Sequence, residues 1–372
     1  MIPEPTDEEK AHLERIARDV KERVEQAGFE AIIGGSYAKG TWLSGTRDID
    51  VFARADVTSE RELEKRIRIL KDAFPEASTV RGSREYLRFE HESVTIEIIP
   101  IRPLSADANT MDHSPDHIAY VREHLKNPVE VRRLKALLKA NRIYGAESYV
   151  RGFSGYVCEL LIIRYETISE LARNAAQWRE GERVSFHETP KDFDDALIVE
   201  DPTDPDRNAA GAVERETLDA FIGLMRRIAN NEPIESLMKP KTLEPPYARV
   251  RIRASHEKPD VGFSQLRSLH DRLVRELEPY GVTAAQWSID TDVWESRYEL
   301  ERYELERETE RLGPPLHMTS SVEKFRSEHP NAYEKDDRIA ARVERDETRW
   351  EDVASRVLTH EHVASYECEV IR

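Results

Sequence analysis

The sequence predicts an α+β protein with a mixed-sheet head, a helical central domain and a small α+β C-terminal domain. Three observations lead to this fold class in a chain of 372 residues. In the first part of the chain, apolar stretches typical of strands are separated by a glycine turn and by a segment of helical periodicity. A mostly helical stretch follows over residues 129–231. Beyond Pro245-Pro246, strand and helix patterns alternate again. We therefore expect domains at residues 1–128, 129–244 and 245–372.

The head opens with a helix and a strand that lead into a glycine turn. Helical periodicity covers Asp7–Ala27, and the apolar residues 31–33 predict a short buried strand. Gly34-Gly35 then predicts a tight turn, with a helix starting at Ser36. Backbone N–H groups at a helix start attract anions, so we expect Gly35 and Ser36 to bind the phosphates of a nucleotide.

Two aspartates follow this turn at strand spacing. In the strand predicted for residues 48–52, Asp48 and Asp50 share one face, and the residue between them faces the core. Like charges this close repel each other unless a cation lies between them. A solvated aspartate pair beside a glycine-rich turn is the structural alternative. The order of strand, turn, helix and second strand weighs against it.

A third carboxylate lies in the strand predicted over residues 94–100, after a helix predicted within Ser59–Ala73. Glu97 is the only charge in this β-branched run, and such a carboxylate is costly unless it meets a cation or points to solvent. An edge strand with Glu97 exposed is the structural alternative. Two carboxylates alone leave one of two metals short of ligands, so Asp48, Asp50 and Glu97 together predict a catalytic two-metal site for Mg²⁺.

The central domain begins with a helix that has two different faces. Its apolar positions, at helical spacing, are Val131, Leu134 and Leu138. Its basic positions, three and four residues apart, are Arg132, Lys135 and Lys139. A solvated charged face is the structural alternative, whereas the aspartates earlier in the chain favour a phosphate partner. A polar insert over Glu180–Asn208 contains Asp-Pro turns and is predicted to place Arg207 on a loop.

The C-terminal domain is predicted to start with a strand, a helix and a second strand. These elements are expected at Ala248–Ala254, Phe263–Pro279 and Thr283–Ile289. The first strand places the arginines at positions 249, 251 and 253 on one face. The charged run Glu295–Leu312 is ambiguous, because its mixed charge alone suits an exposed helix.

Two blocks of this sequence resemble the archaeal, class I CCA-adding enzymes (tRNA nucleotidyltransferases) of the polymerase β-like nucleotidyltransferase superfamily. The glycine turn with its aspartate pair is specific enough to indicate only the superfamily. Residues 130–147, continuing through 151–161, resemble the class I family closely. The likeness extends to Asp201-Pro202 with Arg207-Asn208 and past Leu312-Gly313-Pro314, so it covers nearly the whole chain. It implies a polymerase β-like nucleotidyltransferase head.

The resemblance implies template-independent addition of CMP and AMP to the 3′ end of tRNA, with CTP and ATP as substrates and pyrophosphate as product. Ser36 and Lys39 would contact the nucleotide phosphates. The triphosphate site would be completed by Ser114, His117, Lys135 and Tyr144. Arg207 would lie beside the incoming base and help to select C or A. For Ser114 and His117 the structural alternatives are a helix cap and a surface histidine. The family also suggests a strand over Glu295–Leu312, which we follow.

Departures from the family pattern keep two other functions open. Glu97 stands where the family typically has Asp, Lys39-Gly40 where it has Arg-Asn, and Ser114 where it has Thr. The replacement of aspartate by Glu97 bears on activity because the coordination geometry of Mg²⁺ is strict. At Lys39, the side chain lacks the bidentate phosphate-binding geometry of arginine. One alternative is a paralogue that extends another acceptor or makes an oligonucleotide signal. The other is an inactive tRNA-binding relative. We favour CCA addition.

The net charge raises a question about tRNA as a partner. A formal charge of −17 is unusual for such a protein, because phosphate neutralisation by cations drives most non-specific nucleic-acid affinity. Local clusters must then supply the positive charge. These are residues 132–142, 239–241 and 249–253.

The remaining composition bears on location and redox chemistry. No apolar run is long enough to span a membrane, and residues 1–7 lack the order of a secretion signal, so we expect a cytoplasmic protein. Cys158 and Cys368 lie far apart without metal-ligand companions, which predicts neither zinc nor a disulfide framework. Cys158, within an apolar run, is expected in the core. The sequence leaves a homodimer open.

Overall fold

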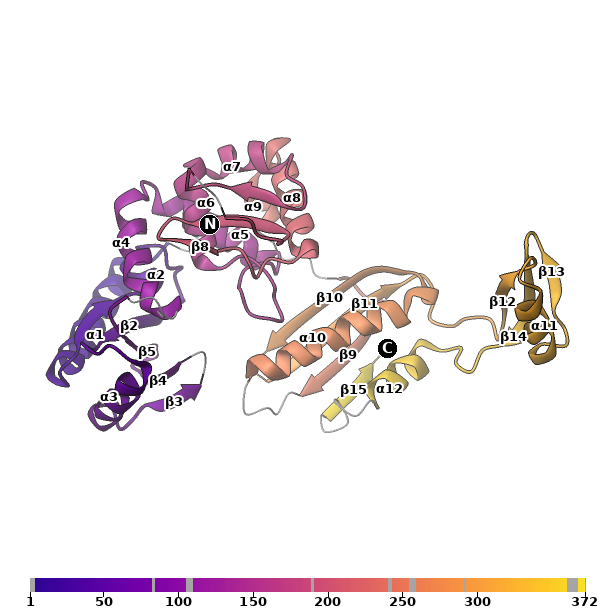
Figure 1. Cartoon of the computed structure of the whole chain (residues 1–372), viewed down its shortest axis with the longest axis horizontal. Coiled ribbons are helices and arrows are strands. Elements are labelled where there is room, and N and C mark those ends of the chain that lie inside the picture. The colour runs from indigo at the N-terminus through magenta and orange to yellow at the C-terminus, as the bar shows by residue number, and fades with distance from the viewer. Residues whose placement is uncertain are drawn as a thin grey trace. The chain divides into compact units, whose positions relative to one another are not determined.

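The computed structural model describes residues 4–81, 84–104, 110–188, 191–239, 243–253, 259–290, 292–359 and 367–371. The chain divides into two compact units, Met1–Pro240 and Lys241–Arg372. Figure 1 labels most of the helices and strands of both units. The predicted boundary between residues 128 and 129 falls inside the first unit, at the start of a helix, and the three-domain division stays a prediction.

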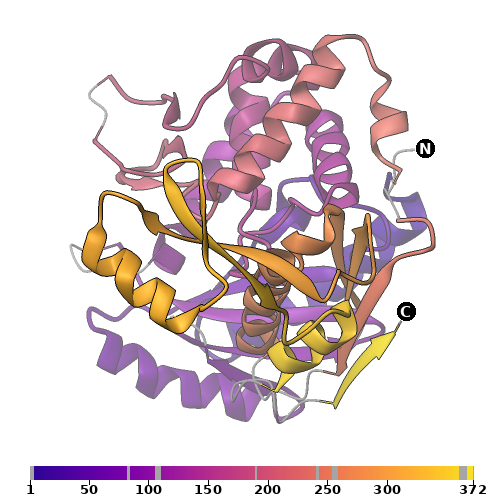
Figure 2. The same ribbon diagram turned by 90° about the vertical axis from the view of Figure 1, so that its right-hand side faces the viewer.

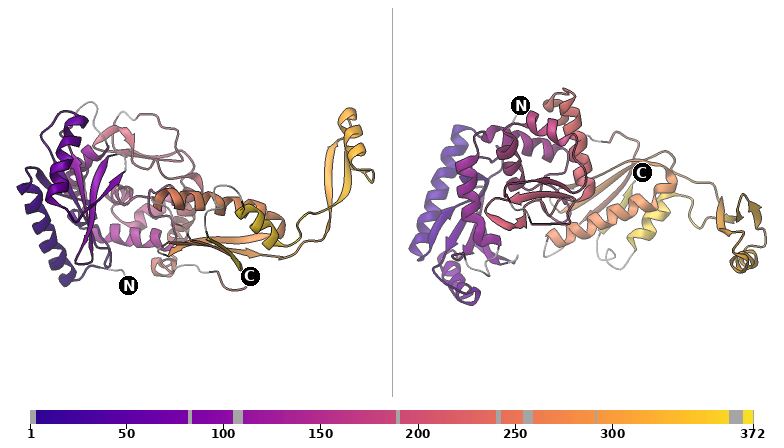
Figure 3. Two further views of the ribbon diagram at one scale, coloured as in Figure 1. Left: turned by 90° about the horizontal axis from the view of Figure 1, so that it is seen from below. Right: turned by 45° about the horizontal axis from the view of Figure 1, so that its top comes forward.

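The head of the first unit is a mixed sheet, as predicted. Its strands are β1 Glu30–Ile33, β2 Asp48–Arg54, β3 Ser78–Arg81, β4 Glu85–His91 and β5 Val94–Ile101. They lie in the order β1-β2-β5-β4-β3, in which β2 and β5 are parallel and the other neighbours are antiparallel. The helices of the head are α1 Asp7–Gln26 and α3 Glu60–Ala73. Both formed where the periodicity predicted them, and α1 lies along the strands in Figure 3.

The cap and the apolar stripe of α1 explain its position. Thr6 accepts a hydrogen bond from the Glu9 backbone, and the Glu9 side chain accepts one from the Thr6 backbone, which forms a capping box. The buried stripe consists of Leu13, Ile16, Ala17, Val20 and Val24. This stripe shares a core with the inward-facing residues of the head sheet.

The glycine turn packs directly onto β2. The helix that follows it, α2 Gly35–Ala38, begins one residue before the predicted start at Ser36. The Gly34 N–H donates to the Asp50 carbonyl at 2.8 Å, and a Cβ at Gly34 would lie 2.2 Å from the Phe52 ring. Gly35 has φ +63°, and its Cβ would lie 1.9 Å from a carboxylate oxygen of Asp50. Glycine is therefore required at both positions, because no side chain fits between the turn and β2.

The central part of the first unit is mostly helical and has its own core. Its helices are η1 Thr110–His113, α4 Ser114–His124, α5 Pro128–Ala140, α6 Gly155–Tyr165, α7 Ile168–Ala175, α8 Arg215–Ala229 and α9 Ile234–Leu237. Its strands are β6 Glu182–Val184, β7 Leu197–Asp201 and β8 Asp204–Asn208. In Figure 2 the magenta and salmon helices of this region lie side by side, and α5 to α9 contribute to one hydrophobic cluster.

The prediction that Arg207 lies on a loop is wrong. Arg207 belongs to β8, which pairs antiparallel with β7. Asp201 ends β7, and its carboxylate accepts hydrogen bonds from the N–H and the hydroxyl of Thr203. The Asp-Pro sequence that indicated a loop therefore forms the tight end of a hairpin.

The second unit contains two antiparallel sheets. Its strands are β9 Ala248–Arg253, β10 Val282–Asp290, β11 Val293–Leu300, β12 Glu308–Pro315, β13 Tyr333–Lys335, β14 Arg338–Glu344 and β15 Glu367–Ile371. Its helices are α10 Pro259–Glu276, η2 Glu278–Tyr280, α11 Thr319–Glu328 and α12 Trp350–Leu358. The larger sheet has the order β10-β11-β9-β15 and the smaller one β12-β14-β13. Helix α10 lies against the larger sheet in Figure 1.

The ambiguous run Glu295–Leu312 is mostly strand. It is divided between β11 and β12, and residues 301–307 between them lie outside both strands. The helix predicted over residues 263–279 is α10, which starts and ends earlier than expected. Among the described residues, no helix is long and apolar enough to cross a membrane.

The arginine face of β9 is present, but its charges are paired. Arg249, Arg251 and Arg253 alternate with buried residues as predicted. Arg251 lies 3.2 Å from Glu295, and Arg253 lies 3.3 Å from Asp292. These arginines are therefore not an open cationic strip. Of the cluster at residues 239–241, only Lys239 is within the described residues.

Candidate active site

Three carboxylates lie on two neighbouring strands of the head sheet. The register of the parallel strands β2 and β5 places Asp50 directly beside Glu97. Ile49 and Val51 are fully buried on the opposite face, so Asp48 and Asp50 share a face as the strand pattern predicted. The edge-strand alternative for Glu97 is wrong, because β5 lies between β2 and β4.

The side chains around these carboxylates do not compensate their negative charge. Burial raises the pKa of Asp50 to about 6, the charge of Asp48 adds to the rise, and Lys39 opposes it. Burial and the charge of Asp50 also raise the pKa of Glu97, although Arg88 lies 3.8 Å away. Within the described part of the chain, the side chains of Asp48 and Asp50 form no ion pair or hydrogen bond.

The carboxylates suit Mg²⁺ as an incomplete set of ligands. No group of three or more histidine, cysteine or acidic side chains among the described residues is already arranged to hold a metal ion. Mg²⁺, however, is usually bound by one or two carboxylates together with substrate phosphates and water. The unpaired oxygens of Asp48 and Asp50, with the raised pKa of Asp50, fit such a site because a divalent cation would relieve their repulsion.

A second cluster joins the turn after α2 to two helices of the central region. Glu159 on α6 is fully buried, and one of its oxygens accepts from Lys39 Nζ at 2.6 Å. The other oxygen accepts from the Thr41 hydroxyl at 2.5 Å and from Lys135 Nζ at 3.3 Å. Lys135 Nζ also donates to the carbonyl and to the hydroxyl oxygen of Thr41, at 3.2 and 3.0 Å. The predicted phosphate ligands Lys39 and Lys135 therefore share one carboxylate.

The basic residues of α5 do not form one solvated stripe. Lys135 is only 2% exposed, and Arg132 donates to the Gly40 carbonyl at 2.6 Å. Tyr144 and Lys135 lie beside each other near Gly155. A Cβ added to Gly155 would be 3.1 Å from the Tyr144 hydroxyl and 3.3 Å from Lys135 Nζ. Burial raises the pKa of Tyr144, so its phenol stays protonated. The solvated-face alternative is wrong for Lys135.

A third cluster gathers around Asp201 at the end of β7. Asp201 is fully buried, and one of its oxygens lies 2.5 Å from Arg207 Nη1 and 2.8 Å from His117 Nε2. The other oxygen accepts from the Tyr156 hydroxyl at 3.0 Å. Hydrogen bonds and ion pairs outweigh burial here, and they hold the pKa of Asp201 well below its usual range. His117 is buried, so the surface-histidine alternative is wrong.

Tyr156 lies between the Glu159 and Asp201 clusters. Lys39 Nζ is 5.7 Å from the centre of its ring, and the guanidinium carbon of Arg207 is 5.8 Å from it. The His117 ring lies 4.4 Å away. Thus the structure brings together Lys39, Lys135, Tyr144, His117 and Arg207. Their proposed contacts with a nucleotide stay predictions.

The segment just before Ser114 is held by a buried network that the sequence analysis did not identify. Ser114 is the first residue of α4, whose cap position is His113, so the helix-cap alternative is wrong. The preceding Asp112 is buried, and Arg84 donates to both of its oxygens, at 2.6 and 3.0 Å. Arg84 also binds Glu60 at the start of α3. This network fixes the segment that carries Ser114 and His117 against the end of β5.

Glu159 and Asp201 were the functional candidates that the sequence analysis missed. Glu159 is the only acid in the apolar run of residues 156–163, and Asp201 follows the apolar residues 197–199. The same rule that selected Glu97, a lone charge in an apolar segment, would have selected Glu159.

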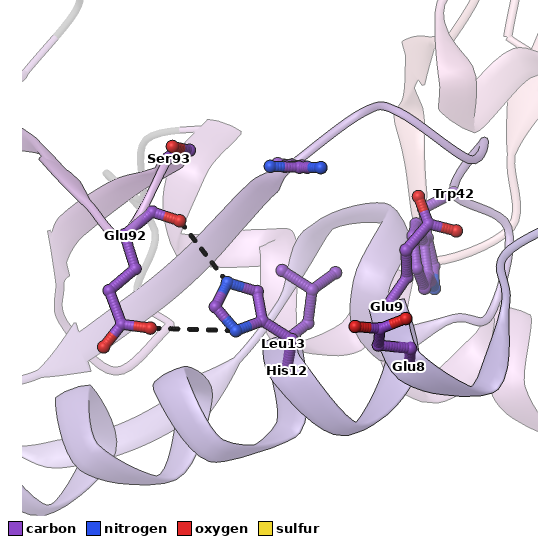
Figure 4. Close-up of a pocket in the computed structure, with 8 residues that line it drawn as sticks. Glu8, Glu9, His12, Leu13, Trp42, Glu92 and Ser93 are labelled. Carbon is purple, nitrogen blue, oxygen red and sulfur yellow. Dashed lines mark hydrogen bonds and ion pairs between the residues drawn. The ribbon is translucent and has the colours of Figure 1, made fainter.

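The head also contains a separate cavity of about 600 Å³. Its lining comes from the start of α1, the segment before β2 and the turn between β4 and β5. Figure 4 shows Glu92 facing His12, with Glu8, Glu9 and Trp42 further along the same wall. None of the predicted site residues lines this cavity.

Two family models match the first unit. Residues 13–105 match the nucleotidyltransferase domain, and residues 129–238 match the second domain of tRNA nucleotidyltransferases. The CCA-adding enzyme of Methanopyrus kandleri is 31% identical over 96% of this chain and 84% of that protein. The CCA-adding enzyme of Sulfurisphaera tokodaii is 30% identical over 98% of this chain and 92% of that protein. Among solved structures, a cytoplasmic RNA terminal U-transferase matches with a TM-score of 0.50 and 14% identity, over 64% of this chain and 95% of that one.

Proposed function

The chain belongs to the CCA-adding enzymes, the tRNA nucleotidyltransferases, and on this premise we propose that Asp48, Asp50 and Glu97 are its catalytic residues. It adds CMP and AMP to the 3′ end of tRNA without a nucleic-acid template, and its head has the polymerase β-like nucleotidyltransferase fold. The observation that carries the site proposal is the register of β2 and β5, which places Asp50 beside Glu97. Mg²⁺ as the metal and a cytoplasmic location belong to the proposal.

The three carboxylates are the groups that would hold the metal. Asp48 and Asp50 offer unpaired oxygens on one face of β2, and Glu97 adds another from β5. When bound there, Mg²⁺ would favour ionisation of the tRNA 3′-hydroxyl and neutralise charge on the phosphates. The extra methylene of Glu97 compared with aspartate carries its oxygens further from the strand.

The other site residues would position the nucleotide. Backbone N–H groups at Gly35 and Ser36 begin the helix directly beside Asp50, where they would donate to the triphosphate. Lys39 and Lys135 supply positive charge from one cluster. Ser114, His117 and Tyr144 are proposed to complete this triphosphate site. Positioning of this kind supplies most of the catalysis in phosphoryl and nucleotidyl transfer.

Arg207 is proposed to lie beside the incoming base. Its guanidinium is partly exposed, and the buried Asp201 fixes one edge of it. The free donors of a planar group held in this way can contact a base edge in a defined direction. In the reaction, the tRNA 3′-oxygen bonds to the α-phosphorus of CTP or ATP. The bond from that phosphorus to the bridging oxygen breaks, pyrophosphate leaves, and the hydroxyl proton is released to solvent.

A gel assay tests this function directly. The protein is incubated with Mg²⁺, one labelled nucleoside triphosphate and tRNA that ends before CCA, after C or after CC, beside the Asp50→Asn variant. We expect stepwise addition of C, C and A that then stops, and none in the variant. Addition to a different acceptor would instead support the paralogue, and tRNA binding without extension would support the inactive relative.

A further inference from the structure

Glu159 occupies an unusual place in the site. Its carboxylate is fully buried on α6, yet it binds two lysines that come from different parts of the first unit. Lys39 follows α2 in the head, and Lys135 is on α5. One cationic partner is enough to balance the charge of a buried carboxylate. The second lysine therefore leaves the cluster with one excess positive charge.

The hydrogen-bond donors of Lys135 are all used inside this cluster. Its ammonium group has three donors, and they meet the carbonyl of Thr41, the hydroxyl of Thr41 and Glu159. Thr41 in turn donates its hydroxyl proton to Glu159. The amine is thus fixed in direction by three acceptors, two of which belong to the segment that follows the glycine turn.

We propose that Glu159 is a positioning residue of the nucleotide site, which holds Lys39 and Lys135 together at one edge of that site. An incoming nucleoside triphosphate then meets Lys39 already in place, with the buried charge of Lys135 fixed beside it, and bears no cost for bringing the two charges together. The inference rests on the proposed function for the assignment of the two lysines to the triphosphate. It goes beyond that assignment by naming the group on which both depend.

The charges around Lys135 determine how the loss of Glu159 would act. Burial lowers the pKa of Lys135, Glu159 raises it, and Lys39 lowers it. The other titratable neighbours are Cys158 on α6 and Tyr144 after α5, and burial raises the pKa of both, so they stay neutral. Without Glu159, Lys135 faces only the like charge of Lys39. It would then lose its proton as the pH rises.

The Glu159→Gln variant tests this inference by CTP binding in the absence of tRNA, where no chemistry takes place. Dissociation constants are measured by titration calorimetry at pH 6.5 and pH 8.5 with the same Mg²⁺ concentration. At pH 8.5 we expect CTP to bind about tenfold more weakly than to the wild type, since the positive charge of Lys135 beside the triphosphate is lost. At pH 6.5 the difference should shrink to about threefold or less, because Lys135 regains its proton.

Glu170→Gln is the matched control, because Glu170 on α7 forms an ion pair only with the exposed Arg173 among the residues that the structure describes. It should leave CTP affinity unchanged at both pH values. A Glu159→Gln protein that binds CTP like the wild type, or more weakly by the same factor at both pH values, overturns the inference. A wild-type protein that binds no CTP contradicts the proposed function instead.

A double variant covers the case in which Glu159→Gln does not fold. Lys135→Gln with Glu159→Gln replaces the buried pair by neutral side chains of similar size, which buried sites often tolerate. Thermal unfolding checks that it is folded. We expect it to bind CTP more weakly than Lys135→Gln alone, because Lys39 also loses the carboxylate that positions it, and by the same factor at both pH values. A weakening that still depends on pH would overturn the inference.

Discussion

Replacing Asp50 by asparagine should stop nucleotide transfer and stabilise the metal-free protein at the same time. The pKa of Asp50 rises from 3.8 to about 6 in the folded state. Because the folded pKa is the higher one, folding favours the protonated acid, and the ionised carboxylate destabilises the fold. The full effect is present above pH 6 and disappears below the unfolded pKa.

The size of this effect follows from the two pKa values. At 1.36 kcal/mol per pKa unit, the ionised carboxylate costs up to about 3 kcal/mol at pH 8, and about half of that remains at pH 5. Asparagine has nearly the same shape and no charge, so it fits beside Gly35 without this penalty. We therefore expect the free energy of unfolding of Asp50→Asn to exceed that of the wild type by up to about 3 kcal/mol at pH 8.

Urea unfolding at pH 8 and pH 5, with a chelator present, measures the stability, and incorporation of labelled CMP measures the transfer. Asp56→Asn is the control, because Asp56 is an exposed aspartate just after β2. Added Mg²⁺ should stabilise the wild type more than Asp50→Asn, since a ligand stabilises the state that binds it. An Asp50→Asn protein that is less stable than the wild type at pH 8, or that transfers CMP at near-normal rates, would refute the reasoning.

Three further changes test the parts that surround the carboxylates. Gly35→Ala should reduce kcat/KM for CTP incorporation by at least about 100-fold, because the left-handed backbone costs roughly 1–2 kcal/mol and the new Cβ overlaps a catalytic carboxylate. Asp112→Asn should lower the free energy of unfolding, measured in urea, by about 1–3 kcal/mol, because Arg84 loses its buried partner and keeps only Glu60. Asp201→Asn should raise KM for CTP and ATP by about tenfold and weaken the choice between them, because Arg207 loses the ion pair that directs it.

For each of these three variants, one result would contradict the prediction. Normal kcat/KM in Gly35→Ala would show that the turn moves away from β2. A negligible loss of stability in Asp112→Asn would show that Glu60 alone compensates the charge of Arg84. Unchanged selection between C and A in Asp201→Asn, measured with tRNA ending in C or CC, would remove Asp201 from base recognition.

The sequence predicted the parts of the site that depend on local patterns. The β2 strand follows from alternation, since Ile49 and Val51 must face the core and therefore turn both aspartates to the other side. The glycine turn follows from its two glycines, and the close approach to Asp50 explains why both are needed. These features involve neighbours in the chain or on one strand, and periodicity reports such neighbours directly.

The sequence could not predict which distant residues share a charge. Lys135 was read as part of a basic stripe because three basic residues recur on α5, but it is buried against Glu159 and Thr41. The partner that buries Lys135, Thr41, is 94 residues away in the sequence. The strand that carries Arg207 was missed for a related reason: its pairing is fixed by Asp201 side-chain contacts that spacing does not reveal.

Charge pairing divides the buried and half-buried acids of the site into two groups with different roles. Glu159 and Asp201 are fully buried, each holds two cationic or potentially cationic side chains, and the pKa of each is lowered. Asp50 and Glu97 have raised pKa values instead, and the side chains around them do not compensate their charge. A carboxylate that is already paired with cationic side chains serves to orient those side chains. For a carboxylate without such a partner, binding of a cation relieves the electrostatic repulsion and stabilises the folded protein. The direction of the pKa shift therefore separates the acids proposed to position the nucleotide-binding side chains from those proposed to hold the metal.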